Sequence, residues 1–230
     1  MIYCRGRPDW DETRFLMHFL RPGDGFVDVG AHIGTYSLLA ASYVGPTGWV
    51  VAFEPSMEGA KRFRFNLRLN DFPWVTLHEA AVGQFSGTVR FTSGLDAMNQ
   101  IATRENMAGI EVPQVALDGI LKGRRPAAAK LDIEGAEPLA LAGWERSLRQ
   151  GSPMAMLNEV NNGIRRFGFH ENALAKWLAE RSYRIGLYHS DQRRIEWRAD
   201  PWSQRENILA IHEPSLPEVL RRIRSQPQTA

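Results

Sequence analysis

The segment 26–34 constrains the fold of this chain more than any other part of the sequence. It reads Phe-Val-Asp-Val-Gly-Ala-His-Ile-Gly, so a short apolar run contains Asp28, and two glycines, Gly30 and Gly34, bracket a turn. Residues 35–42 then have the composition of a helix. A strand, a tight turn and a helix in this order are typical of the place where an α/β sheet opens to hold an adenosine cofactor.

The rest of the chain predicts an α/β fold with a mostly parallel sheet and helices on both faces. The predicted strands are 26–29, 49–53, 75–78, 87–92, 112–117, 127–133 and 154–157, and the predicted helices are 9–20, 35–42, 57–69, 137–149 and 171–181. Near-continuous apolar strands in βαβ order indicate a parallel sheet that is covered on both faces. Two closing strands, 183–188 and 207–211, are joined by a charged loop and are expected to be antiparallel.

Length and composition favour a single domain over residues 1–230. Within it, residues 1–21 are expected to hold a helix that caps one edge of the sheet, and 213–230 to form a short helix or a frayed tail.

The net charge of +2 is too small to indicate a nucleic-acid partner. Cys4 is the sole cysteine, which excludes an internal disulfide and a Cys-based zinc site. No signal segment and no apolar run of about 20 residues is present, so we expect a cytoplasmic protein without a membrane partner. The sequence does not indicate an oligomeric state.

Four acidic residues follow or end predicted parallel strands: Asp28, Glu54, Asp132 and Glu159. In open α/β sheets the ligand lies outside these strand ends. Glu54 comes roughly 20 residues after Gly34, a spacing that suits a carboxylate accepting both ribose hydroxyls. The turn lacks the middle glycine that admits a pyrophosphate, so a cationic cofactor without one, such as S-adenosylmethionine (SAM), fits better than NAD.

Five motifs occur in unbroken order between residues 22 and 159. They are Asp28-Val-Gly-Ala-His-Ile-Gly, Phe-Glu54-Pro55, Ala80-Ala81-Val-Gly83, Val-Ala-Leu117-Asp118 and Lys130-Leu-Asp132-Ile-Glu134-Gly135-Ala-Glu137. In this order they resemble the FkbM-type methyltransferase family. The resemblance implies a class I, Rossmann-like SAM-dependent methyltransferase with a reversed last strand, which O-methylates a hydroxyl of a sugar or natural product.

The cofactor-binding residues that this resemblance and the strand-end pattern imply are Asp28, Gly30, Ala31, His32, Gly34, Thr35, Glu54, Pro55, Ala80, Ala81 and Asp132. One residue departs from the family, because His32 stands where asparagine is more frequent. That departure leaves backbone contacts to the cofactor unaffected but puts any contact by this side chain in question.

A hydroxyl is a poor nucleophile near neutral pH and benefits from a base. We therefore expect Asp132 to orient the acceptor or to act as the base, with Glu134 supporting it. Lys130 lies in an apolar strand, where we expect it to join a buried ionic network with Asp118, Asp132 and Glu134, as structural support or as part of the chemistry.

Several alternatives stay open at this point. Asp132 and Glu159, aided by Asn161, could hold Mg²⁺ in a metal-dependent version of the same reaction. We rank this version below the metal-free one, because a single acidic pair is thin evidence for a metal site. An N-methyltransferase, a NAD-binding oxidoreductase and a non-catalytic cofactor-binding module are the other candidates. The acceptor is expected to be a small hydroxylated molecule that lies under the segments 93–110, 161–170 and 188–202. His170 and His189 are more typical of surface or hydrogen-bonded histidines than of bases.

Overall fold

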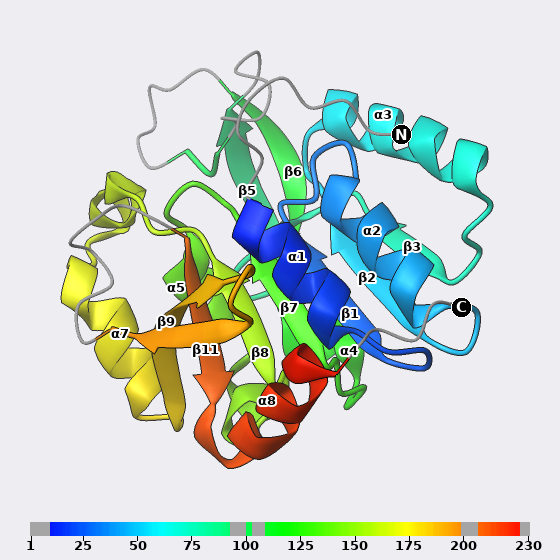
Figure 1. The fold of residues 1–230 in the computed structure, drawn as a ribbon. Coiled ribbons are helices and arrows are strands. Elements are labelled where there is room, and N and C mark those ends of the chain that lie inside the picture. Colours follow the sequence, from blue (N-terminus) through cyan, green and yellow to red (C-terminus); the bar gives the residue numbers. More distant parts are fainter. Residues whose placement is uncertain (1–9, 93–99, 103–108, 199–206, 226–230) are drawn as a thin grey trace.

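An eight-stranded sheet lies at the centre of the molecule (Figure 1). The computed structural model describes residues 10–92, 100–102, 109–198 and 207–225. The sheet consists of β1 (Gly25–Val29), β2 (Trp49–Phe53), β3 (Val75–His78), β7 (Ala128–Leu131), β8 (Ala155–Asn158), β9 (Tyr183–His189), β10 (Arg194–Trp197) and β11 (Ile208–His212). Their spatial order is β10-β9-β11-β8-β7-β1-β2-β3. The five strands from β8 to β3 are parallel, whereas β11 runs antiparallel to both β8 and β9. The predicted mostly parallel sheet with a reversed last strand is therefore confirmed.

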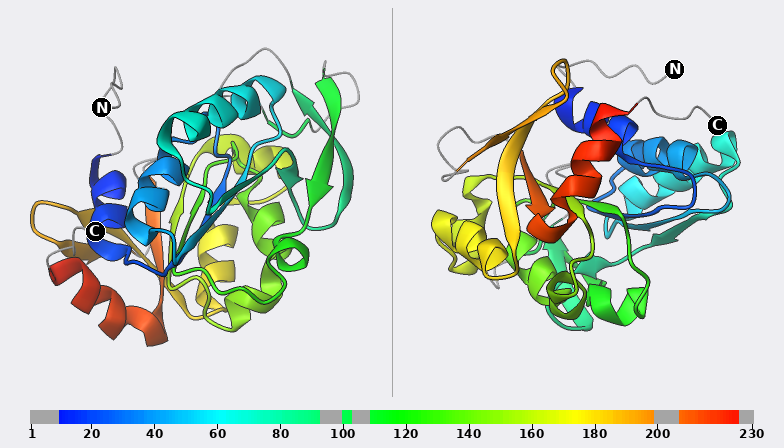
Figure 2. Two further views of the ribbon diagram at one scale, coloured as in Figure 1. Left: turned by 90° about the vertical axis from the view of Figure 1, so that its right-hand side faces the viewer. Right: turned by 60° about the horizontal axis from the view of Figure 1, so that its bottom comes forward.

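Helices cover both faces of this sheet (Figures 1 and 2). One face carries α1 (Trp10–Phe19), α2 (Thr35–Val44), α3 (Met57–Asn70) and α8 (Leu216–Arg224), and the other carries α4 (Leu117–Leu121), α5 (Glu137–Ala142), α6 (Glu145–Arg149), η2 (Asn162–Phe167) and α7 (Glu171–Ala179). Successive strand residues point to opposite faces. Phe26 accordingly joins the apolar cluster under α1, and its neighbour Val27 joins the cluster that contains Trp144. No described helix is long and apolar enough to cross a membrane.

Helix α1 covers a face of the sheet and does not cap an edge. Phe15, Leu16 and Phe19 are fully buried in the cluster that contains Phe26 of β1 and Leu157 of β8. These strands lie in the interior of the sheet. Helix α1 also contacts α2 and α8. Its apolar stripe is therefore buried most completely when the helix lies over the middle strands of the sheet.

Three predicted elements differ in the structure. The strand predicted at 112–117 is β6 (Gly109–Val115), and Leu117 is instead the first residue of α4. The helix predicted at 137–149 is two helices that separate at Gly143, where a Cβ atom would lie 2.1 Å from the carbonyl oxygen of Gly83. The charged loop after β9 contains the strand β10. A small second sheet, of order β4-β6-β5, adds β4 (Ala81–Val82) and β5 (Gly87–Thr92).

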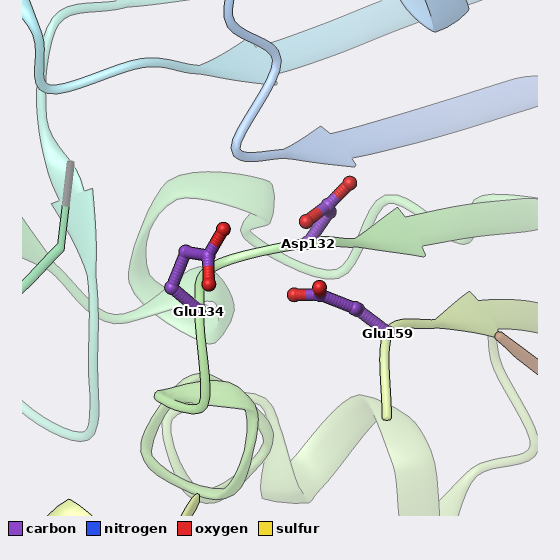
Figure 3. A group of neighbouring side chains, drawn as sticks. All are labelled: Asp132, Glu134 and Glu159. Atoms are coloured by element: carbon purple, nitrogen blue, oxygen red, sulfur yellow. The ribbon is translucent and has the colours of Figure 1, made fainter. Parts of the chain in front are cut away.

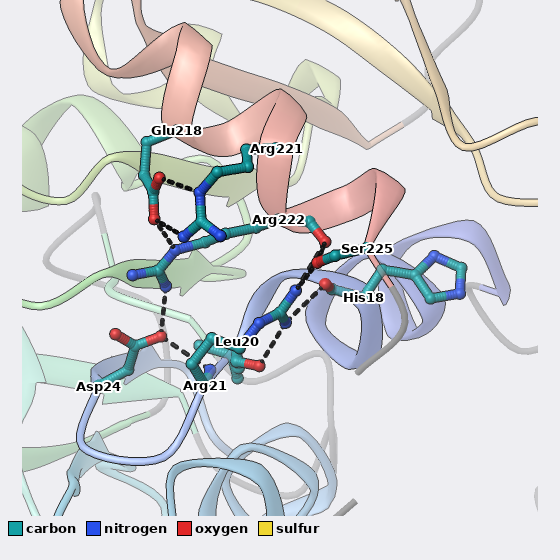
Figure 4. A network of polar contacts seen from close by, with 8 residues as sticks. All are labelled: His18, Leu20, Arg21, Asp24, Glu218, Arg221, Arg222 and Ser225. Atoms are coloured by element: carbon teal, nitrogen blue, oxygen red, sulfur yellow. Dashed lines mark hydrogen bonds and ion pairs between the residues drawn. The ribbon is translucent and has the colours of Figure 1, made fainter. Parts of the chain in front are cut away.

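Helix α8 is fastened to the start of β1 by a polar network (Figure 4). The Asp24 carboxylate accepts hydrogen bonds from the guanidinium of Arg222 at 2.5 Å and from the backbone N–H of Arg21 at 2.8 Å. The Arg21 guanidinium in turn donates to the carbonyl of Arg222 and to the hydroxyl of Ser225. The described part of the segment 213–230 is thus a docked helix.

Candidate active site

A pocket of about 520 Å³, its open mouth included, lies at the carboxyl ends of the central strands. The turn after β1, the ends of β2 and β7, and the small sheet form its walls. The predicted site residues among its lining are Gly30, His32, Glu54, Pro55, Ala80, Ala81 and Asp132. The sequence did not predict the other six lining residues, which are apolar: Val29, Phe53, Val82, Phe91, Ile101 and Ile133. Phe91 comes from the small sheet, and Ile101 from an isolated bridge to it.

The turn after β1 has a backbone that its sequence explains. Gly30 has φ of +83°, and a Cβ atom there would lie 1.9 Å from the carbonyl oxygen of Asp132. Gly34 has φ of +89°, and its Cβ would lie 2.2 Å from the ring of Phe63 in α3. Both glycines are therefore required for close packing of the turn against β7 and α3, in addition to the predicted approach of a ligand. His32 has φ of +49°, a left-handed conformation that asparagine and histidine adopt more readily than most residues.

Glu54 is held in place by backbone donors. One of its carboxylate oxygens accepts from the N–H of His32 and the other from the N–H of Ser56, both at 2.7 Å. Burial raises the pKa of Glu54 above its ordinary value, although these hydrogen bonds lower it. Each carboxylate oxygen has a second lone pair, so both can also accept from a ligand hydroxyl. The side chain lies in the pocket wall where the sequence predicts the ribose.

Asp28 lies behind the turn and is not among the lining residues. It is 1% exposed, and its carboxylate accepts from the hydroxyl of Ser37 in α2 at 2.6 Å. Burial raises its pKa to about 6. Ala31, Gly34 and Thr35 are likewise outside the lining of this pocket in the described chain. Asp28 therefore ties the end of β1 to α2, and the predicted contacts of these four residues with the cofactor stay predictions.

Three carboxylates converge beside this pocket (Figure 3). Asp132 follows β7, Glu159 follows β8, and Glu134 stands in the turn after Asp132. One oxygen from each of them lies within 4.8 Å of the others. Parallel strands bring their carboxyl ends to the same edge of a sheet, which is why residues 27 positions apart in the sequence meet here. The sequence predicted each carboxylate, but not that all three form one group.

Lys130 lies in β7 beneath this group. Its side chain is 6% exposed, and Nζ donates to Oδ2 of Asp132 at 2.5 Å. Nζ also lies 4.6 Å from the centre of the Tyr36 ring, a cation–π contact that the sequence did not reveal. The predicted buried ionic pair with Asp132 is confirmed. Asp118 does not belong to it, because its carboxylate accepts from the backbone N–H groups of Arg146 and Ser147 at the start of α6.

The neighbouring carboxylates differ in protonation. Burial raises the pKa of Asp132, but the adjacent Lys130 ammonium outweighs burial and holds the pKa below its ordinary value. Burial, together with the negative charges of Asp132 and Glu134, raises the pKa of Glu159 to about 8. At neutral pH, Asp132 is therefore ionised while Glu159 is mostly protonated. Two acidic groups whose environments push their pKa values apart are a common arrangement in sites that move protons.

The turn that carries Glu134 is braced from two sides. Glu134 has φ of +56°, an uncommon conformation for a residue with a side chain. The amide of Asn161 donates to its carboxylate at 3.2 Å, and Arg166 donates to its carbonyl at 2.6 Å. From below, the buried Glu137 carboxylate accepts from the N–H groups of Ile133 and Gly135. Sequence reasoning assigned no role to Glu137, although a carboxylate at the first turn of a helix is a recognisable signal.

The fit of a divalent cation to this group is limited. Asp132, Glu134 and Glu159 offer oxygen ligands of the kind that Mg²⁺ prefers. However, the positively charged Lys130 ammonium already binds one Asp132 oxygen at 2.5 Å and would repel Mg²⁺ at that carboxylate. The donor set therefore favours the metal-free version of the site.

The predicted acceptor segments are placed as follows. Residues 161–170 contain η2, and Asn161 contacts Glu134 at the strand ends, as expected. Tyr188 and Trp197 instead lie inside β9 and β10, where they pack in the apolar cluster under α1 and α8. His189 pairs with Glu196 at 2.8 Å, which fits its predicted role as a hydrogen-bonded histidine. Most of 93–110, and Trp202, lie outside the described residues.

Comparison with solved structures identifies the fold. A methyltransferase FkbM from Methylobacillus flagellatus KT matches with a TM-score of 0.53 and 21% identity over 87% of this chain and 50% of that one, so this chain spans half its length. An rRNA methylase from Streptococcus thermophilus matches with a TM-score of 0.51 and 14% identity, over 90% of this chain and 96% of that one. A Streptococcus mutans protein classed provisionally as a methyltransferase, in complex with SAH, matches with a TM-score of 0.51 and 12% identity, over 90% and 97%. These likenesses show a class I methyltransferase fold.

The comparison of sequences is more specific. No curated protein matches this chain significantly. The profile of the Methyltransferase FkbM domain matches residues 28–185, which contain the turn after β1, Glu54 and all three converging carboxylates. The match covers well over half of the sequence, and the chain therefore belongs to the FkbM family of SAM-dependent methyltransferases.

Proposed function

We propose that this protein transfers a methyl group from SAM to a hydroxyl oxygen of a small acceptor, a sugar or a natural product. The observation that carries the proposal is the ionised Asp132, held by Lys130 at the carboxyl end of β7 and open to the pocket. The Asp132 side chain is 37% exposed, so an acceptor can reach it. The family and the pocket support SAM as the cofactor.

The residues present fit that cofactor. Glu54 would accept from the ribose hydroxyls, and the apolar residues Ala80, Ala81 and Phe91 would face the adenine. When bound, SAM supplies an electrophilic methyl group whose bond to sulfur breaks as the new bond to oxygen forms. Asp132 accepts a hydrogen bond from the acceptor hydroxyl, orients its oxygen, and takes up the proton that the oxygen loses. Glu134 supports Asp132 from the adjacent turn, and positioning of the acceptor supplies much of the rate.

The test is incubation with isotopically labelled SAM and pooled sugars and hydroxylated natural products, followed by mass spectrometry for a labelled methyl gain. Fragmentation of the product distinguishes a methyl on oxygen from one on nitrogen. Replacing Asp132 by Asn should lower turnover by about 10²- to 10⁴-fold. Unchanged turnover of Asp132→Asn on an identified acceptor contradicts the assignment of the base.

The competing functions give different results in the same system. A Mg²⁺-dependent enzyme would lose activity on exhaustive chelation and regain it with added Mg²⁺, whereas the proposed mechanism tolerates chelation. An oxidoreductase would bind NAD in calorimetric titrations in which SAM gives no heat. A non-catalytic module would bind SAM without forming any labelled product.

A further inference from the structure

Helix α3 presents large apolar side chains to solvent. Met57, Phe65 and Leu69 are 74%, 54% and 67% exposed. All three come from one helix of 14 residues that runs along the outside of the molecule (Figures 1 and 2). Large apolar residues gathered on one exposed face are uncommon on a soluble domain and mark interaction surfaces.

Phe65 and Leu69 lie on the side of α3 that faces away from the core, and Met57 is the exposed first residue of the helix. Gly59, Ala60 and Phe63 form the buried side. Phe65 follows Phe63 by two residues, which turns it about 200° around the helix axis. Leu69, one turn beyond Phe65, lies on the same outward side. This exposure is therefore a consequence of the helical register and cannot be relieved by packing within the chain.

Basic side chains surround Phe65 on this face. Lys61, Arg62 and Arg68 are exposed, and the Arg68 guanidinium lies 6.0 Å from the centre of the Phe65 ring. Arg62 pairs with Glu58 at 3.0 Å across the helix surface. Together with Ile33 and Asn66 of the same region, these residues line an open groove of about 750 Å³. The face thus carries three basic residues around Phe65 and one acidic residue, Glu58, whose charge is paired with Arg62.

We propose that the outer face of α3 docks this protein onto a lipid bilayer that contains anionic phospholipids. Helices that lie in a bilayer interface combine basic residues, which meet the headgroup phosphates, with aromatic and aliphatic residues that enter the acyl boundary. Lys61, Arg62 and Arg68 supply the first contact, and Met57, Phe65 and Leu69 supply the second. The sequence predicts no membrane partner because no segment spans a bilayer, but docking on its surface requires only one helix face.

Two other partners fit this face less well. Single-stranded RNA is bound by stacking on aromatic residues along a basic groove, whereas two of the three apolar residues here, Met57 and Leu69, are aliphatic. A second copy of the chain would form a two-fold interface in which the same patch meets itself. In such an interface Lys61 and Arg68 would approach Lys61 and Arg68 of the other copy, and the repulsion between these like charges is unfavourable.

Docking through α3 would also orient the cofactor pocket. The amide of Asn66 donates to the carbonyl of Ile33, in the turn after β1, at 2.9 Å. Phe63 packs so closely on Gly34 that only glycine fits there. The turn and the helix therefore move as one body, and the pocket would keep a fixed distance from the bilayer. The proposal concerns binding alone and does not depend on methyl transfer.

The test is co-sedimentation of the intact protein with vesicles of phosphatidylcholine alone and of phosphatidylcholine mixed with phosphatidylglycerol. We expect partitioning onto the anionic vesicles that weakens as salt is added. Two double variants, Phe65→Ser with Leu69→Ser and Lys61→Glu with Arg68→Glu, should each lower the partition coefficient by about tenfold or more. The controls are Phe85→Ser, which removes an exposed aromatic residue outside α3, and Arg224→Glu, which reverses an exposed charge on α8.

Both controls should partition like the wild type, and circular dichroism should show that all four variants are folded. Equal binding to neutral and anionic vesicles, or α3 variants that bind like the wild type, would overturn the proposal. Absence of binding to any vesicle would also overturn it. In that case a gel shift with single-stranded RNA would indicate an RNA partner, and a dimer that the Phe65→Ser, Leu69→Ser variant dissociates would indicate a second copy of the chain. Because no step uses SAM, a failure here is separate from a failure of the proposed reaction.

Discussion

Glu54 illustrates how a single carboxylate is prepared for a ligand. Two backbone N–H groups fix its oxygens at 2.7 Å each, so the side chain loses little rotamer freedom when a ligand binds. Gly59 makes room for this arrangement, since a Cβ atom there would lie 3.1 Å from the Glu54 carboxyl carbon. The remaining lone pairs point to charge-assisted hydrogen bonds with ribose hydroxyls.

Replacing Glu54 by Ala should weaken SAM binding by about 1–3 kcal/mol. The loss arises because two ribose hydroxyls lose a charged acceptor. Isothermal titration calorimetry with SAM measures it directly, and Glu111→Ala, an exposed carboxylate on β6, is the matched control. If Glu54→Ala is folded and binds SAM as tightly as the control, the ribose assignment is wrong.

Lys130 determines the charge state of Asp132. The ammonium lies between Asp28 and Asp132, and both carboxylates raise its pKa, although burial alone would lower it. The pair therefore stays ionised in a site that would otherwise favour neutral groups. Lys130 is not itself a pocket-lining residue and reaches the pocket only through Asp132, so in the proposed reaction it would position the base and keep it charged.

Replacing Lys130 by Met should move the acid limb of the rate against pH profile to higher pH. Without the ammonium, burial dominates and the pKa of Asp132 rises, so the carboxylate becomes protonated closer to neutral pH. Initial rates with an identified acceptor over a pH series measure this. Lys130→Arg retains the positive charge and serves as the control. A purely structural role for Lys130 predicts lower rates at every pH with an unmoved limb.

At the scale of elements, α8 shows how a terminal helix is held. Its apolar residues Val219 and Ile223 are fully buried, and its arginines meet the loop before β1 (Figure 4). The side chains of Arg222 and Asp24 are only 13% and 14% exposed, so water compensates little for a missing partner. A mostly buried pair of this kind differs from an exposed pair such as Arg62 with Glu58.

Replacing Asp24 by Ala should lower the free energy of unfolding by about 1–3 kcal/mol. The cost arises because Arg222 and the backbone N–H of Arg21 lose an acceptor in a partly buried place. Urea denaturation measures it. The control Glu58→Ala, which breaks an exposed pair, should change the free energy by less than about 0.5 kcal/mol. Equal small effects of both substitutions would show that the network does not fasten α8.

The sequence predicted elements well where periodicity and breakers agree. The strands at 49–53 and 75–78 have the predicted bounds, and the helix predicted at 57–69 begins at Met57, where Ser56 caps it by accepting from the N–H of Gly59. It failed where tertiary packing decides. Leu117 belongs to α4 although it continues an alternating apolar pattern, and β10 forms in a charged loop because β9 provides a pairing edge.

The site was predictable to a similar extent. The carboxylates Glu54, Asp132 and Glu134 are visible in motifs, because each either directly follows an apolar strand or directly precedes a glycine in a turn. The contacts of Tyr36 with Lys130 and of Asn161 with Glu134 depend on how α2 and η2 cross the sheet. Local sequence carries no signal for such crossings.

At the scale of the whole molecule, the fold concentrates carboxylates that resist ionisation at one end of the sheet. Burial raises the pKa of Asp28 to about 6, that of Glu137 to about 7 and that of Glu159 to about 8. In the unfolded chain these groups titrate near pH 4. The native state therefore binds more protons than the unfolded state between these values, and its stability falls as pH rises through that window.

Glu137 offers the clearest test of this pH dependence, because it is 3% exposed and its hydrogen bonds survive replacement by Gln. The Gln amide oxygen can still accept from the N–H groups of Ile133 and Gly135, but it never ionises. The unfolded Glu ionises above about pH 4, whereas Glu137 in the fold ionises only near pH 7. The stability of the wild type relative to Glu137→Gln should therefore fall by about 2–3 kcal/mol between pH 5 and pH 8. Urea denaturation of the cofactor-free protein at both pH values measures the difference, with Glu111→Gln as the exposed control. If the wild type and Glu137→Gln lose stability in parallel as the pH rises, Glu137 ionises as easily in the folded protein as in the unfolded chain, and the prediction is wrong.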